Sequence, residues 1–195
     1  EITLANILKS LNKCLKSKYF EHISIAELSE DAGVSVGTFY RRFKDKNALI
    51  PLLYQDFGDQ LRGWLVEVEQ HDFSSPHSPQ KSLSFLIEET RQFIEEHKGI
   101  FRTLHLYARL YPGLVPVVKM EQRKQEFARM AQWLSRQIYI QPTKAQRAKT
   151  EMWVFIIVDT LIEKVLYPDL TPAMACEFDT TTYCQHLAQT LLNDI

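Results

Sequence analysis

Apolar residues recur at helical spacing along almost the whole chain, and this periodicity is the feature that most limits the possible folds. Ile7, Leu8, Leu11, Cys14 and Leu15, for example, form one stripe on the first predicted helix. No stretch shows the alternation of apolar and polar residues that indicates a half-buried strand. The sequence therefore predicts an all-α protein.

Start and stop signals divide the periodic pattern into nine predicted helices. They cover residues 3–18, 25–32, 36–42, 46–69, 80–97, 100–110, 114–139, 143–166 and 173–193. Ser24 and Glu27 form an S-x-x-E capping box, in which hydroxyl and carboxylate each satisfy a backbone N–H group at a helix start. Gly33 and Gly99 end helices, and Asp45 is expected to cap the fourth one.

Two features interrupt this regular pattern. Pro51 is expected to kink or reposition the first turns of the fourth helix. The segment 71–79 is rich in serine and proline and is predicted to be a loop.

Length and composition limit the protein class. A chain of 195 residues predicts one or two domains, and an apolar fraction of 45% excludes wholesale disorder. Three scattered cysteines suit a reducing compartment, so we expect a cytoplasmic protein. The first residues lack a basic region followed by an apolar run, so no signal peptide is expected. The most apolar stretch, 152–166, is short and carries charges, so no membrane partner is expected.

Charge is distributed unevenly. Residues 1–54 hold eight Lys/Arg against six Asp/Glu, a net charge of +2, whereas the rest of the chain has a net charge of −3. Arg41, Arg42, Lys44 and Lys46 fall within six residues. A basic head on an acidic body indicates contact with nucleic acid at one end, although a charge cluster is also a common solvated surface.

Residues 25–43 have the pattern of a helix-turn-helix motif. Two short helices flank a turn centred on Gly33, Val34 and Ser35. In such a motif the start of the second helix enters the DNA major groove, while hydroxyl groups, helix N-termini and basic side chains hold phosphates. Small residues at positions 36 and 37 would let the backbone approach the bases closely.

Segment 7–49 resembles the DNA-binding domain of the tetracycline-repressor (TetR) family of bacterial transcription regulators. The matching residues are Ala32-Gly33-Val34-Ser35, Gly37-Thr38-Phe39-Tyr40, Phe43, Lys46 and Leu49. The chain departs from the family pattern at Val36, where many relatives have lysine or another polar residue, at Tyr19, where glycine is common, and at Ile23, where threonine is frequent.

The resemblance implies a division of roles in the DNA-binding helix. Thr38, Tyr40 and Lys46 would hold phosphates, and the face around Val36, Gly37 and Arg41 would meet bases. The full predicted DNA-binding set is Ser24, Ser35, Val36, Gly37, Thr38, Tyr40, Arg41, Arg42 and Lys46.

For the remainder of the chain the resemblance implies architecture only. Residues 1–48 would form the helix-turn-helix domain, and residues 49–195 would form a helical bundle that binds a small-molecule effector and dimerises. Segment 152–158 is apolar on every helical face, which favours a homodimer through the last two long helices. The last helix would contribute Phe178, Tyr183, Leu187 and Leu191.

Aromatic residues of the body could enclose an effector cavity, although at helical spacing they are also typical of plain core. The candidates are Trp64, Phe93, Phe101, His105, Tyr107, Phe127, Trp133 and Trp153. Asp159 lies in an apolar run and would be costly to bury unpaired, so a salt bridge or a dimer hydrogen bond is expected there.

Catalysis has little support. The sequence has no Gly-rich phosphate loop, HExxH or GxSxG motif, and Cys176, Cys184 and His186 lack metal-ligand spacing. We expect no enzyme, no cofactor and no metal. The favoured hypothesis is a homodimeric repressor that leaves a pseudo-palindromic operator in double-stranded DNA when an effector binds. The alternative is an all-helical small-molecule binder or protein-interaction module without DNA binding.

Overall fold

The computed structural model describes residues 2–73 and 78–195. Within these residues all regular structure is helical, with nine α-helices and three short 3-10 helices, which confirms the predicted fold class. The chain falls into two compact units. The first takes in residues up to 60 together with 97–121, and the second takes in 61–96 together with the residues from 122 onward. No helix among the described residues is both long enough and apolar enough to cross a membrane.

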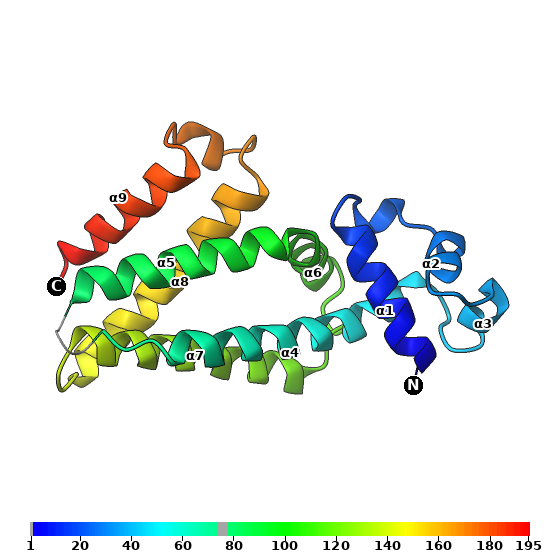
Figure 1. The fold of residues 1–195 in the computed structure, drawn as a ribbon, viewed down its shortest axis with the longest axis horizontal. Helices are drawn as coiled ribbons and strands as arrows, with labels where there is room; N and C mark the ends of the chain where they lie inside the picture. Colours follow the sequence, from blue (N-terminus) through cyan, green and yellow to red (C-terminus); the bar gives the residue numbers. More distant parts are fainter. Residues whose placement is uncertain (1, 74–77) are drawn as a thin grey trace. The chain divides into compact units, whose positions relative to one another are not determined.

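The first unit is built around three N-terminal helices, drawn in blue in Figure 1. Its elements are α1 (Ile2–Leu15), η1 (Phe20–His22), α2 (Ile25–Asp31), α3 (Val36–Tyr40), η2 (Lys46–Leu49), the first half of α4 (Ile50–Glu69), α6 (Lys98–Leu110) and the start of α7 (Val117–Ile138). Helix α2 packs against both α1 and α3. Ile7, Leu11, Leu28 and Phe39 are fully buried there, as the apolar periodicity predicts.

The start of α2 is capped by Ser24, whose Oγ accepts the backbone N–H of Glu27 at 3.1 Å. The Glu27 carboxylate in turn interacts with the backbone N–H of Ser24, as the predicted capping box requires. The same carboxylate accepts from Lys18 Nζ at 2.5 Å, and this bond is the main cause that holds the pKa of Glu27 below its usual range. A charged donor from a neighbouring segment makes a stronger bond than a backbone N–H group.

Asp45 caps a shorter element than the sequence predicts. Its Oδ1 accepts the backbone N–H of Ala48 at 3.2 Å and begins η2, and α4 starts only at Ile50. Pro51 is then the second residue of α4. A proline fits this position because the first N–H groups of a helix have no partner within the helix.

Helix α6 packs on the end of α1 through backbone contact. A Cβ atom at Gly99 would lie 1.9 Å from the carbonyl oxygen of Leu15, so only glycine fits there. Further along α6, the Tyr107 ring meets Phe20 edge to face, with centroids 5.1 Å apart, and the Arg102 guanidinium lies 4.5 Å from the centroid of Tyr19. Helix α6 therefore packs with the N-terminal helices although it lies far from them in the sequence.

The second unit is a bundle in which α5 packs along both α8 and α9 (Figure 1). Its elements are the second half of α4, α5 (Pro79–Glu96), the remainder of α7, α8 (Lys144–Leu166), η3 (Ala173–Ala175) and α9 (Thr180–Leu192). Helix α8 starts with a complete capping box, in which Thr143 and Gln146 satisfy each other's backbone N–H groups.

The last helix begins later than predicted. Residues 173–175 form the separate helix η3, and α9 starts at Thr180, where Asp179 accepts the backbone N–H of Thr182 at 2.9 Å. Between them, Lys164 Nζ donates to the carbonyl of Cys176 at 2.6 Å and so holds this segment outside a helix. Part of the predicted loop 71–79 lies outside the described residues.

Helix α8 has one buried and one exposed face. Trp153 and Ile157 are buried, whereas Met152 and Phe155 are exposed. Asp159 is also exposed, so it bears no burial cost within the single chain. Leu187 and Leu191 of α9, predicted at a dimer surface, are buried within the second unit and pack as core residues.

Replacing Gly99 with alanine tests the contact between α6 and α1. The added methyl group would force the two backbones apart, so we expect the free energy of unfolding to fall by about 2–3 kcal/mol. Gly63→Ala is the control: nothing lies within 4 Å of a Cβ at this helical position, and we expect a gain of about 0.5–1 kcal/mol. Urea denaturation measures both. Equal effects of the two variants would contradict the close approach.

Candidate nucleic-acid interface

Helix α3 is held by aromatic side chains on its inner face. Phe39 is fully buried, and its ring packs on Phe43 with centroids 5.0 Å apart. Other positions of the helix stay open to solvent: Val36 is 40% exposed, and Tyr40, one turn later, is 55% exposed. Five residues are too few for a stable isolated helix, so this packing fixes the direction of the exposed face.

A chain of hydrogen bonds joins three predicted DNA contacts, one within α3 and one at each of its caps. The Ser35 Oγ accepts the backbone N–H of Thr38 at 3.0 Å and lies 2.9 Å from the Thr38 hydroxyl. Arg41 donates from Nη2 to Thr38 Oγ1 at 2.9 Å. Thr38 therefore holds the guanidinium of Arg41 along the helix, and an arginine has five N–H groups, so donors remain for an outside acceptor.

The turn before α3 has the geometry that its sequence predicts. Gly33 has φ = 68°, in the left-handed region that glycine adopts without strain. The backbone N–H of Val34 then donates to the carbonyl of Ser29 at 2.8 Å and closes the turn. The turn brings the capped start of α3 next to the end of α2, as a helix-turn-helix motif requires.

The basic cluster after α3 divides into two groups. Arg41, Arg42 and Lys44 are exposed. Lys46 is partly buried, and its Nζ donates to the carbonyl oxygens of three residues that lie more than 20 positions earlier in the chain. The structure thus brings the other predicted contacts of α3 to one exposed face, while Lys46 points toward η1. A phosphate contact by Lys46 stays a prediction.

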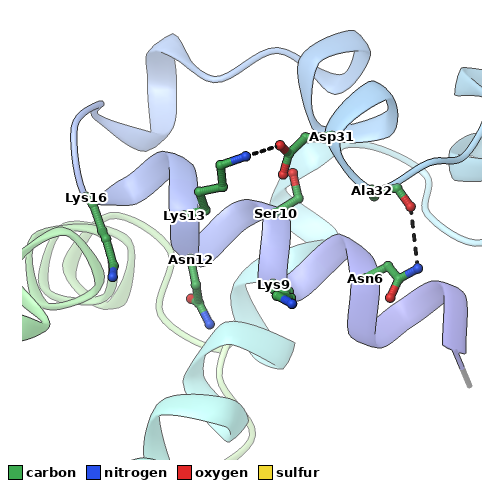
Figure 2. A pocket seen from close by; sticks show the side chains of 8 residues that line it. All are labelled: Asn6, Lys9, Ser10, Asn12, Lys13, Lys16, Asp31 and Ala32. Carbon is green, nitrogen blue, oxygen red and sulfur yellow. Dashed lines mark hydrogen bonds and ion pairs between the residues drawn. The ribbon is translucent and has the colours of Figure 1, made fainter.

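A pocket of about 590 Å³ lies between α1 and the end of α2 (Figure 2). Lys13 reaches across it to the Asp31 carboxylate, and Asn6 donates to the carbonyl oxygen of Ala32 at 3.5 Å. Lys9 and Lys16 add positive charge to its walls. Effector cavities are mostly apolar, so these polar walls differ from those of a typical small-molecule site. No pattern in the sequence predicted this pocket.

Comparison with known proteins relates the sequence of this region to a family. The model of bacterial regulatory proteins of the tetR family matches residues 7–57. The N-terminal domain belongs to the tetR family. An HTH-type transcriptional regulator of Bacillus subtilis, YvdT, described as uncharacterized, is 31% identical over 134 residues. That alignment covers 67% of this chain and 62% of YvdT.

Solved structures share this fold over nearly the full length of the chain. PfmR of Thermus thermophilus, a TetR family transcriptional regulator, has a TM-score of 0.63 at 14% identity, covering 96% of this chain and 97% of its own. FadR of Bacillus subtilis, solved in complex with stearoyl-CoA, has a TM-score of 0.55 at 14% identity and covers 98% of both chains. At such identity the likeness concerns the fold alone.

The structure explains two departures of the tetR-type domain from its family pattern. Ile23, in place of threonine, is buried and fills the core beside η1. Tyr19, in place of glycine, makes a cation–π contact with the Arg102 guanidinium of α6. Both substitutions therefore serve packing within the first unit. Val36 is exposed on α3, and its contact with a thymine methyl group stays a prediction.

The predicted effector residues are distributed over both units. Phe101, His105 and Tyr107 belong to the first unit. Phe101 packs on Phe57, with centroids 4.9 Å apart, and His105 lies beside Phe101. Burial raises the pKa of Tyr107 to about 12, and the neighbouring Glu21 carboxylate adds to this shift. Phe101 and Tyr107 are therefore core residues on the buried side of α6.

In the second unit the candidate tryptophans differ in their hydrogen bonding. Trp133 and Trp153 are both buried. The indole N–H of Trp133 donates to the His71 carbonyl at 3.1 Å, and that of Trp153 donates to the Asp194 carboxylate at 3.3 Å. Phe127 lies at the surface. Trp133 and Trp153 are thus satisfied core residues.

Trp64 and Phe93 are the pair that the structure does bring together, with ring centroids 5.0 Å apart. The indole N–H of Trp64 is buried and has no hydrogen-bond partner among the described residues. The hydroxyl of Thr90, one helical turn before Phe93, is also buried without a hydrogen-bond partner among the described residues. Burying such groups without a partner is costly, so this pair is the strongest candidate for contact with a ligand.

Two buried threonines provide a matched test of that unpartnered hydroxyl. Thr90 and Thr103 are each 4% exposed, but the Thr103 hydroxyl donates to the Gly99 carbonyl at 2.8 Å. Valine has nearly the same shape as threonine. We expect Thr103→Val to cost about 1 kcal/mol, and Thr90→Val to be neutral or stabilising in the ligand-free protein. Denaturant unfolding measures both, and an equal loss would show that Thr90 has a hydrogen-bond partner.

Proposed function

We propose that this protein is a sequence-specific DNA-binding transcription regulator, a homodimeric repressor that a small-molecule effector releases from its operator. The observation that carries the proposal is the exposed face of α3 within a tetR-type domain. Val36, Tyr40 and Arg41 extend from a helix whose orientation the buried Phe39 fixes. In this proposal, α3 enters the major groove and its side chains recognise the DNA sequence through contacts with base edges.

The contacts divide into two kinds. Base edges would be read by Val36, Gly37 and Arg41. Phosphates would be held by the hydroxyl, cap and basic side chains around them, namely Ser24, Ser35, Thr38, Tyr40 and Arg42. Phosphate contacts fix the register of the protein on the duplex, and base contacts carry the sequence information.

The exposed face of α8 supports a homodimer. Met152 and Phe155 lie one turn apart on that face, and Asp159 follows one turn later as a polar margin. Pairing through α8 and the exposed side of α9 would remove these apolar side chains from water. A two-fold dimer would place two recognition helices about 34–36 Å apart and so require a pseudo-palindromic operator.

The Trp64–Phe93 pair supports an effector site in the second unit. Two aromatic rings would supply apolar contact, and the indole N–H of Trp64 and hydroxyl of Thr90 would bond to a polar group of the ligand. FadR of Bacillus subtilis binds stearoyl-CoA in its solved complex, which makes an acyl-CoA a sensible first probe.

The functional division into residues 1–48 and 49–195 is part of this proposal. Helices α4 and α7 each run from one compact unit into the other, so they are continuous covalent routes between effector binding and DNA binding. An effector shifts the conformational equilibrium only as far as its affinities for the two states differ. A regulator of this class would act in the cytoplasm.

Binding to DNA distinguishes the two kinds of contact. Tyr40→Ala should weaken binding to all duplexes by a similar factor, because it removes a phosphate contact. Arg41→Ala should change the sequence preference, with a loss of about 1–3 kcal/mol at the affected base pair. Selection of bound sequences from a random duplex pool, followed by anisotropy titrations at several salt concentrations, measures both effects.

Arg147→Ala is the control for these variants, since Arg147 is an exposed arginine of the second unit. It should leave affinity and preference unchanged. Wild-type protein that shows no salt-sensitive, sequence-selective binding would instead favour the helical binder without DNA recognition.

The dimer is tested by placing charge on α8. Phe155 is 66% exposed in the single chain, and a two-fold interface would contain one copy of it from each subunit. Phe155→Glu should raise the dimer dissociation constant about 100-fold, because two carboxylates would be desolvated without partners. Val66→Glu, on an exposed apolar position of α4, should not change it. Sedimentation velocity measures the assembly; a dimer that survives Phe155→Glu would exclude this face of α8.

A further inference from the structure

Lys46 has an environment that a phosphate-binding lysine does not need. Its Nζ lies 2.6 Å from the carbonyl oxygen of Phe20, 3.1 Å from that of Glu21 and 2.8 Å from that of Ile23. An ammonium group has three N–H donors and no more. All three are therefore used within the protein, and none is left for a phosphate in this conformation.

The aromatic ring of Phe20 adds to this arrangement. The Nζ atom lies 4.7 Å from the ring centroid, within the range of a cation–π contact. Burial lowers the pKa of Lys46 relative to an exposed lysine. The ammonium is thus partly withdrawn from water and is held by oxygen dipoles and a ring face.

The three carbonyl groups belong to one short segment. Phe20 and Glu21 lie in η1, and Ile23 immediately precedes Ser24, the residue that caps α2. Lys46 is the first residue of η2, shortly after the end of α3 at Tyr40. The side chain consequently joins the chain just after α3 to the chain just before α2.

This connection closes the helix-turn-helix motif at its second end. At one end the turn through Gly33 links α2 to α3 covalently, and at the other end Lys46 links the entry of α2 to the exit of α3. A pair of short helices held at one end only could change its crossing angle. A pair held at both ends cannot do so without breaking the hydrogen bonds of Lys46.

We propose that Lys46 is a positioning residue, which fixes the orientation of α3 relative to α2 by holding the carbonyl groups of η1, and that it does not itself contact DNA phosphate. This inference rests on the proposed DNA-binding function. It replaces the phosphate role that the family resemblance implies for this residue.

The two roles differ in salt dependence. Each lysine that neutralises a phosphate contributes about 0.9 to the slope of log K against log salt concentration. Removing such a lysine lowers the slope by about one. Removing a positioning residue weakens binding at every salt concentration and leaves the slope unchanged, because the number of phosphates contacted is the same.

The experiment uses the full chain and three variants. Lys46→Met keeps the apolar stem and removes the N–H donors. Lys46→Arg keeps the charge, but its planar fork cannot direct three N–H groups from one nitrogen to three carbonyls. Lys44→Met is the control, since Lys44 is an exposed lysine in the same basic cluster. Hydrogen exchange without DNA and binding to a random-sequence duplex at about 50–200 mM salt are measured for each.

For Lys46→Met we expect amide exchange in residues 20–27 to be about tenfold faster or more, affinity to fall about tenfold, and the salt slope to equal that of the wild type. Lys46→Arg should also exchange faster and should not restore affinity. Lys44→Met should leave the exchange of residues 20–27 unchanged.

Three results would overturn the proposal. A slope lower by about one in Lys46→Met would identify a phosphate contact. Full recovery of affinity in Lys46→Arg would show that charge alone matters. Unchanged exchange in residues 20–27 would show that the ammonium does not hold η1. Failure of the proposed function is distinguishable, because wild-type protein would then bind no duplex, whereas the exchange of residues 20–27 would still report the contact itself.

Discussion

The burial of Phe39 is the interaction on which the rest of the first unit depends. A helix of five residues cannot persist in water by its own hydrogen bonds, because nucleation costs more than so few bonds return. Phe39, together with Phe43, supplies the missing free energy by packing into the core under α3. Ser35 then satisfies an N–H group at the helix start. Only in this docked state do the exposed side chains of α3 have a defined direction.

Periodicity predicted the number of helices and the fold class because every helix buries one apolar stripe. Helix ends were less predictable, because side chains from other segments bond to groups near some of them. Lys18 bonds to the Glu27 carboxylate at the start of α2, and Lys164 bonds to the carbonyl of Cys176 between η3 and α9. Gly99 was interpreted as a helix stop, but it lies within α6 and permits contact with Leu15. Sequence spacing contains no information about such a partner.

The candidate interface shows the same division between local and distant effects. Ser35, Thr38 and Arg41 interact over three residues, so their motif already determines their geometry. The partners of Lys46 lie more than 20 residues earlier, and no local pattern reveals them. Among the aromatic residues, spacing could not separate Trp133, whose N–H group is satisfied, from Trp64, whose N–H group has no partner among the described residues.

The position of Phe20 has one further consequence. Its ring meets Tyr107 of α6 on one side and the ammonium of Lys46 on another, while its carbonyl accepts a bond from the same lysine. Tyr107 and Lys46 are therefore thermodynamically linked through a single shared neighbour. Substitutions at these two positions will not be additive, and natural sequence change at position 20 must satisfy both partners together.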